Sequence, residues 1–182
     1  YGLKNVNFAR NSVIQILYVG TFEGCTGLES IELPASLTEI PNRGTELFGT
    51  SKYYGLFSEC SSLKRVTFEE GSKLTKIGNY AFSETALESF TFPSSVASVG
   101  EYAFQYTKLT TLTIPATVTS LGAHAFYGCE ELVSVTLGSG IKTLPSGVFG
   151  NCYALTAFTV PATVTSIDSS AFSSCEAIDG FK

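Results

Sequence analysis

The sequence lacks the features that nucleic acids and membranes require of a binding protein. Its 11 Lys and Arg residues stand against 16 Asp and Glu residues, so the net charge is −5 at pH 7. This sign opposes contact with the phosphates of nucleic acids. No run of the sequence approaches the roughly 18 consecutive apolar residues of a membrane-spanning helix. We therefore expect no nucleic acid partner and no membrane insertion by this segment.

The sequence contains an internal repeat instead. The segments "IPATVTSLGAHAFYGCEEL" (114–132) and "VPATVTSIDSSAFSSCEAI" (160–178) are identical at ten of nineteen positions. Their offset of 46 corresponds to two periods of 23 residues. One phenylalanine anchors each of seven periods: Phe22, Phe57, Phe82, Phe104, Phe126, Phe149 and Phe172. Because 44% of the residues are hydrophobic, stacked periods have enough apolar surface to bury a continuous core.

Apolar residues keep a fixed register around this phenylalanine column. They stand five and eight positions before most of the phenylalanines, and an apolar triplet such as Leu109, Leu112 and Ile114 follows six of them. The last two members of each triplet alternate with a polar residue, which is the period of a half-buried strand. The pattern thus predicts one short strand per period and one parallel sheet along an elongated solenoid.

The skeleton "P..V..I...AF..C..L", the 23-residue period and the strand "L..V.I" resemble the leucine-rich repeats of BspA-like bacterial and protist surface proteins. The resemblance covers Leu3 to Phe181. It implies an α/β leucine-rich-repeat solenoid: a right-handed arc with one parallel β-sheet on the concave face and mostly irregular or short helical turns on the convex face. It also implies a cell-surface or secreted protein. We expect a single domain over 1–182, with about seven repeats, cut from a longer protein.

Three functions are compatible with this pattern. The resemblance favours a non-enzymatic protein-binding or adhesion module, whose ligand is a host, matrix or neighbouring-cell protein. A structural spacer that carries another domain is the alternative. A carbohydrate-active β-solenoid enzyme is disfavoured because it needs acidic residues clustered on one face, and the central strand positions have none. The family supplies no catalytic residues, and we expect no cofactor.

The cysteines all stand three residues after a column phenylalanine: Cys25, Cys60, Cys129, Cys152 and Cys175. Unpaired cysteine packs as a small hydrophobic residue, so a buried ladder of free thiols is the favoured interpretation. Disulfides are the next alternative, although neighbouring side chains would point in parallel and the odd count leaves one thiol over. Zinc is disfavoured because a straight row of thiolates does not form a tetrahedron.

The only histidine, His124, precedes Cys129 by five residues. A cysteine nucleophile needs a histidine within hydrogen-bond reach and a third group that orients the histidine. The column of His124 also accepts Gly147 and Ser170, which predicts an outward surface position for His124 and an inward one for Cys129. No catalytic pair is therefore expected.

The repeat is broken by an insertion at 41–56, and charge gathers beside it at one end of the predicted sheet. Long loops without a period are often functional, and tyrosine and arginine are enriched at interface hot spots. The alternatives are that the loop's aromatic residues cover the solenoid edge and that the charges only solvate the sheet. The predicted contact surface comprises Arg43, Phe48, Lys52, Tyr53 and Tyr54 in the loop, and Glu29, Glu32, Lys64, Arg65 and Glu88 on the strands.

Overall fold

The computed structural model describes residues 2–42 and 55–178, and within these ranges it contains short strands and turns but no helix. The expected irregular turns are therefore present, whereas the short helical turns are not. The strands are β1 (Asn5–Val6), β2 (Ser30–Leu33), β3 (Glu39–Ile40), β4 (Arg65–Phe68), β5 (Lys76–Ile77), β6 (Ser98–Val99), β7 (Thr111–Ile114), β8 (Ser120–Leu121), β9 (Ser134–Leu137), β10 (Thr143–Leu144), β11 (Ala157–Phe158) and β12 (Ser166–Ile167).

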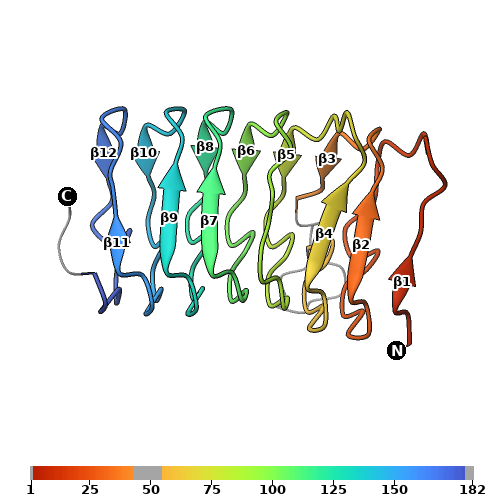
Figure 1. Cartoon of the computed structure of the whole chain (residues 1–182), viewed down its shortest axis with the longest axis horizontal. Coiled ribbons are helices and arrows are strands. Elements are labelled where there is room, and N and C mark those ends of the chain that lie inside the picture. Colours follow the sequence, from red (N-terminus) through yellow and green to blue (C-terminus); the bar gives the residue numbers. More distant parts are fainter. Residues whose placement is uncertain (1, 43–54, 179–182) are drawn as a thin grey trace, which may run out of the picture.

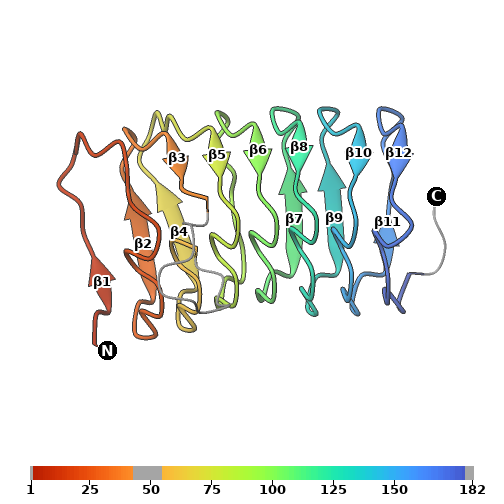
Figure 2. The same cartoon turned by 180° about the vertical axis from the view of Figure 1, so that it is seen from behind.

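Each period forms one coil, and the coils lie side by side in sequence order along the long axis of the molecule (Figure 1). The strands form two rows, which the reverse view also shows (Figure 2). The long-strand row comprises β1, β2, β4, β7, β9 and β11, and the short-strand row comprises β3, β5, β6, β8, β10 and β12. All pairings are parallel. A solenoid of stacked coils is thus confirmed.

The prediction of one strand per period is incomplete, because most coils form a second strand. The second residue of this strand is apolar, and in five of the six short strands it is buried, such as Ile77 in β5 and Leu121 in β8. A polar residue precedes each of them, so two residues suffice to alternate between core and solvent. The sheets formed are β3-β5-β6-β8 and β10-β12 in the short-strand row, and β1-β2-β4 and β7-β9-β11 in the long-strand row.

The core is built on the phenylalanine column. The seven rings form one continuous stack, with neighbouring centroids 5.2 to 5.7 Å apart and planes within 26° of each other. The backbone N–H of these residues also bonds to the next coil, as from Phe104 to the Ala125 carbonyl at 2.8 Å. Five of the rings have no exposed surface: Phe57, Phe82, Phe104, Phe126 and Phe149.

The turn after each phenylalanine has the same unusual backbone in every coil. The residue two positions after the ring has φ between 54° and 68°, although only two of the seven are glycine. This left-handed conformation is costly for other residues. It aims the N–H at the next coil, as from Tyr106 to the Tyr127 carbonyl at 2.9 Å, so a hydrogen-bond ladder between coils holds the strained turns in place.

The predicted single sheet is interrupted in the middle of the long-strand row. Residues 89–92 form no strand, so the row divides into β1-β2-β4 and β7-β9-β11. The residue at the centre of the missing strand is Phe90, whereas the four-residue strands have Ile31, Val66, Leu112 or Val135 in that column. Phe158 occupies the same column in β11, which has only two residues. A ring in this column therefore accompanies a shortened or missing strand.

The crowding around Phe90 explains the interruption. Its ring contacts the rings of Phe68, Phe82, Phe92 and Phe104, with centroids 5.8, 5.4, 4.9 and 4.8 Å away. The coil thus packs three rings where a regular coil packs one ring and two aliphatic side chains. Overfilling a packed core displaces the backbone, which accounts for the absence of backbone hydrogen bonds between 89–92 and β4.

Candidate binding face

Five residues of the predicted contact surface lie on the long-strand row or next to it, and all five are exposed. Glu32 is on β2 and is paired in register with Thr67 of β4, while Arg65 is paired with Ser30. The Lys64 N–H donates to the Glu29 carbonyl at 3.0 Å, so these two residues are neighbours directly before the strands. Glu88 follows on the next coil. The structure therefore brings these predicted residues together on one face.

The two cations on this face differ in their surroundings. Lys64 forms an ion pair with Glu88, with Nζ and Oε1 3.2 Å apart. Arg65 has no ion pair with any residue in the described ranges. An exposed pair such as Lys64–Glu88 contributes only about 0 to 1 kcal/mol. Of the two cations, Arg65 is thus the one whose charge is available for a ligand.

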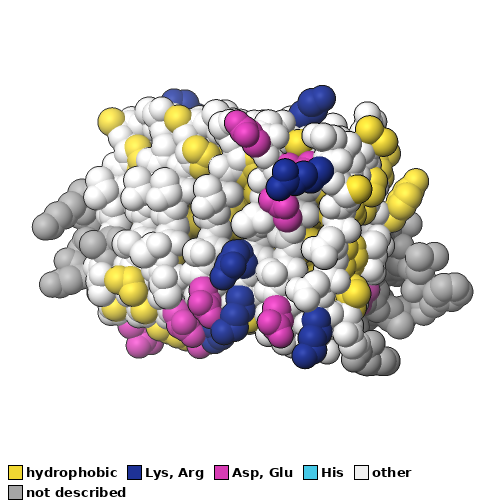
Figure 3. All heavy atoms as spheres, turned by 45° about the vertical axis from the view of Figure 1, so that its right-hand side comes forward, with side chains coloured by type: hydrophobic (Ala, Val, Ile, Leu, Met, Phe, Trp, Pro, Cys, Tyr) yellow, Lys and Arg dark blue, Asp and Glu magenta, His cyan; other side chains and the backbone are white. Residues whose placement is uncertain are grey.

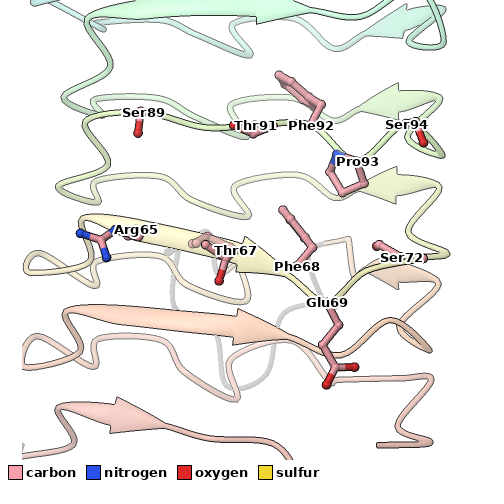
Figure 4. Close-up of a pocket in the computed structure, with 12 residues that line it drawn as sticks. Arg65, Thr67, Phe68, Glu69, Ser72, Ser89, Thr91, Phe92, Pro93 and Ser94 are labelled. Atoms are coloured by element: carbon pink, nitrogen blue, oxygen red, sulfur yellow. The ribbon is translucent and has the colours of Figure 1, made fainter. Parts of the chain in front are cut away.

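A pocket of about 540 Å³ lies beside Arg65, between β4 and residues 89–94. Figure 4 shows Arg65 and Ser89 at one end of this pocket and Pro93 and Ser94 at the other. The lining also includes the hydroxyls of Thr67 and Thr91 and the apolar residues Phe68 and Phe92. The pocket therefore combines a cation, hydroxyl groups and aromatic surface.

The pocket is a consequence of the interrupted sheet. Within the described residues, no backbone hydrogen bond joins 65–68 to 89–92. The edge of β4 that faces this segment consequently has no backbone partner there, which exposes strand N–H and C=O groups beside the pocket. A smaller pocket, of about 320 Å³, lies on the other side of the segment, against Thr111 and Thr113 of β7.

Glu69 lines the larger pocket next to Phe68. It stands in the column that holds Pro34, Pro93 and Pro115 in other coils. Its Oε2 accepts a hydrogen bond from the Ala35 N–H at 3.0 Å, and Figure 4 shows the carboxylate directed toward β2 and away from the 89–94 segment. Glu69 is thus committed to the neighbouring coil, which leaves Arg65 as the charged side chain that faces a ligand.

The loop half of the predicted surface lies outside the described residues. These loop residues are Arg43, Phe48, Lys52, Tyr53 and Tyr54. Their contribution to binding stays a prediction. The regular coil resumes at Gly55, where a side chain would collide with the Tyr80 backbone of the next coil.

The five cysteines are free, as the favoured interpretation predicts, but only Cys60, Cys129 and Cys152 are buried, while Cys25 and Cys175 are half-buried. Four of the thiols donate to the carbonyl of the column phenylalanine in the previous coil, as Cys60 Sγ does to Phe22 O at 2.9 Å. In the two coils without cysteine, Thr85 and Thr107 donate to Phe82 O and Phe104 O at 2.9 and 3.0 Å. The column thus selects a small side chain that can donate a hydrogen bond, to the previous coil from cysteine and within the same turn from threonine.

The environment of the three buried thiols opposes nucleophilic chemistry. Burial raises the pKa of Cys60 to about 12 and that of Cys129 to about 11. The neighbouring Cys175 thiol and burial both raise the pKa of Cys152. Because the thiolate is the reactive form, the buried cysteines of this ladder are structural.

The predicted surface position of His124 is wrong. Its ring is half-buried and stacks on Tyr102, with centroids 4.7 Å apart and planes within 5°. Tyr102 stacks in turn on Tyr80 at 4.9 Å. The backbone of all three residues is left-handed, with φ of 57°, 55° and 58° for Tyr80, Tyr102 and His124. Gly147 continues the column because a side chain there would collide with the imidazole.

The imidazole is therefore a rung in a second ring stack. Its Nδ1 is buried and has no hydrogen-bond partner among the described residues. No contact joins it to Cys129, whose thiol is hydrogen-bonded to Thr107 and Phe104. Glycine occurs in this column because the backbone there is left-handed, and not because the side chains of the column are exposed to solvent.

The described residues contain no group of three or more His, Cys, Asp and Glu side chains placed to hold a metal ion. In the same ranges, no helix has the length and apolarity to cross a membrane.

The pocket at the sheet interruption is not predicted by the sequence analysis. A signal for it exists: Phe90 and Phe92 fill with rings two columns in which every other coil has at most one ring.

Comparison with known proteins agrees with this architecture. The chain is similar over its whole length to a leucine-rich repeat protein from Bacteroides ovatus of known crystal structure, with 26% identity and a TM-score of 0.77, and it covers 41% of that protein. It is also similar to the T. pallidum leucine-rich repeat protein TpLRR, with 28% identity and a TM-score of 0.69. That match covers 86% of this chain and 68% of TpLRR. No curated protein matches.

The profile of the BspA type leucine rich repeat region matches residues 2–47 and 50–179, with six copies. This match covers nearly all of the chain, and it agrees with the phenylalanine stack, the cysteine ladder and the parallel strand rows described above. The chain therefore belongs to the BspA-type leucine-rich repeat family.

Proposed function

We propose that this chain is a non-enzymatic protein-binding module of a cell-surface or secreted adhesion protein, and that it binds its ligand on the long-strand row around the sheet interruption. The observation that supports this most is the pocket of about 540 Å³ beside Arg65, a cation that has no ion pair with another described residue. Solenoids of this type use extended surfaces to bind other proteins.

The pocket suits one side chain of a protein ligand that lies across the row. Its apolar lining, Phe68 and Phe92, offers surface that becomes buried on binding, and arginine forms bidentate contacts with carboxylates. The exposed threonines of neighbouring coils, such as Thr67, Thr91 and Thr113, offer hydroxyls that donate and accept hydrogen bonds on either side.

The proposal is tested by blocking the pocket. Beads coated with the chain are applied to layers of host cells and of extracellular matrix, and their adherence is counted. Thr91→Arg fills the pocket, and Arg65→Ala removes the cation; each should reduce adherence several-fold. Ser120→Arg is the matched control because Ser120 is exposed on β8 in the short-strand row. Equal adherence of the Thr91→Arg and Ser120→Arg beads would refute this location of the site.

The insertion at 41–56 belongs to the same proposal. Replacing residues 42–54 with a four-residue turn shortens the spacing from Phe22 to Phe57 from 35 to 26 residues, which is close to the regular period. If Arg43, Phe48, Lys52, Tyr53 and Tyr54 extend the binding face, the shortened chain adheres less well than the wild type. Unchanged adherence would leave Glu29, Glu32, Lys64, Arg65 and Glu88 as the contact surface without the loop.

A structural spacer is the second candidate. It is supported by the continuous stack of seven rings, which favours a stiff, elongated array. The same beads distinguish the two functions, because a spacer has no ligand of its own. Wild-type beads that adhere no better than uncoated beads would favour the spacer.

A further inference from the structure

A second distinctive surface lies along the edge where the coils turn into the long strands. Three tyrosines gather there on successive coils, Tyr106, Tyr127 and Tyr153. Tyr106 and Tyr153 are each 43% exposed, although most large hydrophobic side chains of the described residues are buried. The rings of Tyr106 and Tyr127 are in edge contact, with centroids 5.8 Å apart. We call these three residues, together with Glu84 and Glu130, the tyrosine edge.

Two of the rings are held in place before any ligand arrives. The ring of Tyr106 lies against Gly128, where any side chain would collide with it. The Tyr127 ring lies over Gly150 in the same way, and its hydroxyl accepts a hydrogen bond from Asn151 Nδ2 at 2.7 Å. Glycine in the following coil makes room for these rings and packing already fixes them. The two tyrosine side chains therefore lose little conformational entropy when a ligand covers their exposed faces.

Two exposed carboxylates flank the rings. Neither Glu84 nor Glu130 has an ion pair with another described residue. Both are near Tyr106: its pKa is raised by burial first, and then by the charges of its neighbours, including Tyr127, Glu84, Glu130 and Tyr153. The adjacent ammonium of Lys108 is paired with Glu131 at 3.3 Å. The edge thus carries an excess of negative charge beside aromatic surface.

The shape of this edge admits an extended ligand. A shallow groove of about 410 Å³ runs beside Tyr106, between Glu84 and Lys108. Figure 3 shows hydrophobic, acidic and basic side chains along the lower edge of the molecule. The pocket beside Arg65 lies on other residues, so the two surfaces can be tested separately.

We propose that the tyrosine edge binds an arginine-bearing extended segment of a protein partner. A guanidinium stacks on the free face of a tyrosine and forms bidentate hydrogen bonds with a carboxylate, and the edge offers both groups side by side. The net charge of −5 favours encounter with a basic segment. This surface is additional to the long-strand row. Its carboxylates favour a cationic ligand, whereas Arg65 on the long-strand row favours an anionic one.

The test uses the peptide Gly-Arg-Gly-Arg-Gly-Arg with an N-terminal dye, and fluorescence anisotropy measures its affinity for the whole chain. The double variant Glu84→Gln/Glu130→Gln should weaken binding by about five-fold, since exposed charge pairs contribute up to about 1 kcal/mol. Tyr106→Asn should weaken binding by about three-fold, because a cation–π contact at an exposed site contributes about 0.5 to 1 kcal/mol. Asparagine suits this position, since Asn151 has the same left-handed backbone in its coil.

Three controls decide the outcome. Glu70→Gln/Glu101→Gln removes the same charge from exposed positions off the edge and should leave affinity within two-fold of the wild type. A peptide with glutamate in place of arginine should not bind. Arg65→Ala should have no effect, which separates this surface from the proposed adhesion site.

The proposal would be overturned if Glu84→Gln/Glu130→Gln and Glu70→Gln/Glu101→Gln weakened peptide binding equally. It would also be overturned if Tyr106→Asn bound the peptide with wild-type affinity and had an unchanged unfolding midpoint. Tight binding of the glutamate peptide would overturn it as well.

Discussion

At the scale of single residues, each coil has one position whose backbone is left-handed whatever residue occupies it. The residue two positions after each ring is left-handed in all seven coils, yet it is Glu, Tyr, Asn or Ser in five of them. Such residues cost roughly 1 to 2 kcal/mol each in this conformation. The inter-coil hydrogen bonds of the turn offset that cost. The protein therefore contains strain that single substitutions can relieve.

The strain is tested at Ser174, whose φ is 58° and whose side chain is exposed. Ser174→Gly should raise the free energy of unfolding by about 1 kcal/mol, because glycine adopts this backbone without the Cβ clash. The neighbouring exposed residue Ser173 lacks a left-handed backbone, so Ser173→Gly should lower stability by about 0.5 kcal/mol. Urea titrations of both variants measure the difference, and equal shifts would contradict the assignment of strain.

The cysteine ladder makes stability depend on alkaline pH. Cys60 and Cys129 have pKa values of about 12 and 11 in the folded chain, above the ordinary value of 9.0. Between pH 9 and 11 the unfolded thiols lose protons that the folded thiols keep. The free energy of unfolding therefore falls as pH rises through this window, by about 1.4 kcal/mol per pH unit for each such thiol.

Cys129→Thr isolates this effect, because threonine occupies the same column at Thr85 and Thr107. The variant should lose less stability than the wild type between pH 9 and 11, while the two chains respond alike between pH 6 and 8. Chemical denaturation at several pH values measures both slopes. A pH dependence identical to that of the wild type would show that the Cys129 thiol already ionises in the folded chain.

At the scale of elements, an aromatic residue in one column accompanies a shortened or missing strand. Regular coils place Ile31, Val66, Leu112 or Val135 at the centre of a four-residue strand. Phe90 stands in the same column, and its coil has no strand. The pocket beside Arg65 exists because that strand is missing. Packing inside one coil thereby shapes the surface on which we place binding.

Replacing this ring should restore the ladder. In Phe90→Leu the backbone of 89–92 is released toward β4, and its amides should gain hydrogen bonds to the neighbouring strands. Hydrogen exchange followed by NMR should then show slower exchange of the Thr91 amide, by about ten-fold or more, which corresponds to about 1.4 kcal/mol. Phe158→Leu should lengthen β11 in the same way. Exchange at Thr91 as fast as in the wild type would mean that another feature holds the segment out.

At the scale of the whole molecule, each coil depends on its neighbours. The seven stacked rings and the ladders of parallel backbone bonds connect only adjacent coils, so stability is close to a sum of coil and interface contributions. A defect in the middle of the array therefore interrupts two interfaces, whereas a defect at an end interrupts one. The position of a substitution along the array should matter as much as its chemistry.

Phe104 and Phe172 provide this comparison. Phe104 is fully buried between two rings, while Phe172 is half-buried at the end of the stack. Phe104→Ala should cost about 3 to 5 kcal/mol and split urea unfolding into two transitions. Phe172→Ala should cost less and leave one main transition. Because the chain has nine tyrosines and no tryptophan, tyrosine fluorescence follows both halves. A single transition in Phe104→Ala would show that the array unfolds as one unit.

Much of this architecture could be predicted from the sequence, because a repeat places the same residue types in the same environment. The phenylalanine stack, the cysteine ladder and the strands with Leu112 or Val135 at their centres follow from their columns. The short-strand row was missed since two residues are too few for a periodic signal. His124 was placed on the surface because its column accepts glycine, whereas the glycine reports the left-handed backbone.

The sequence by itself determined the solenoid, its period and its family, since these depend on positions that recur in every coil. Only the tertiary structure decided where the long-strand row is interrupted, that Arg65 lacks an ion pair in the described residues while Lys64 has one, and that three tyrosines share one edge. The reason is physical. Each of these features depends on side chains of two or more neighbouring coils, which determine the free space and the charged partners at the surface. The residues of one period alone do not determine these contacts.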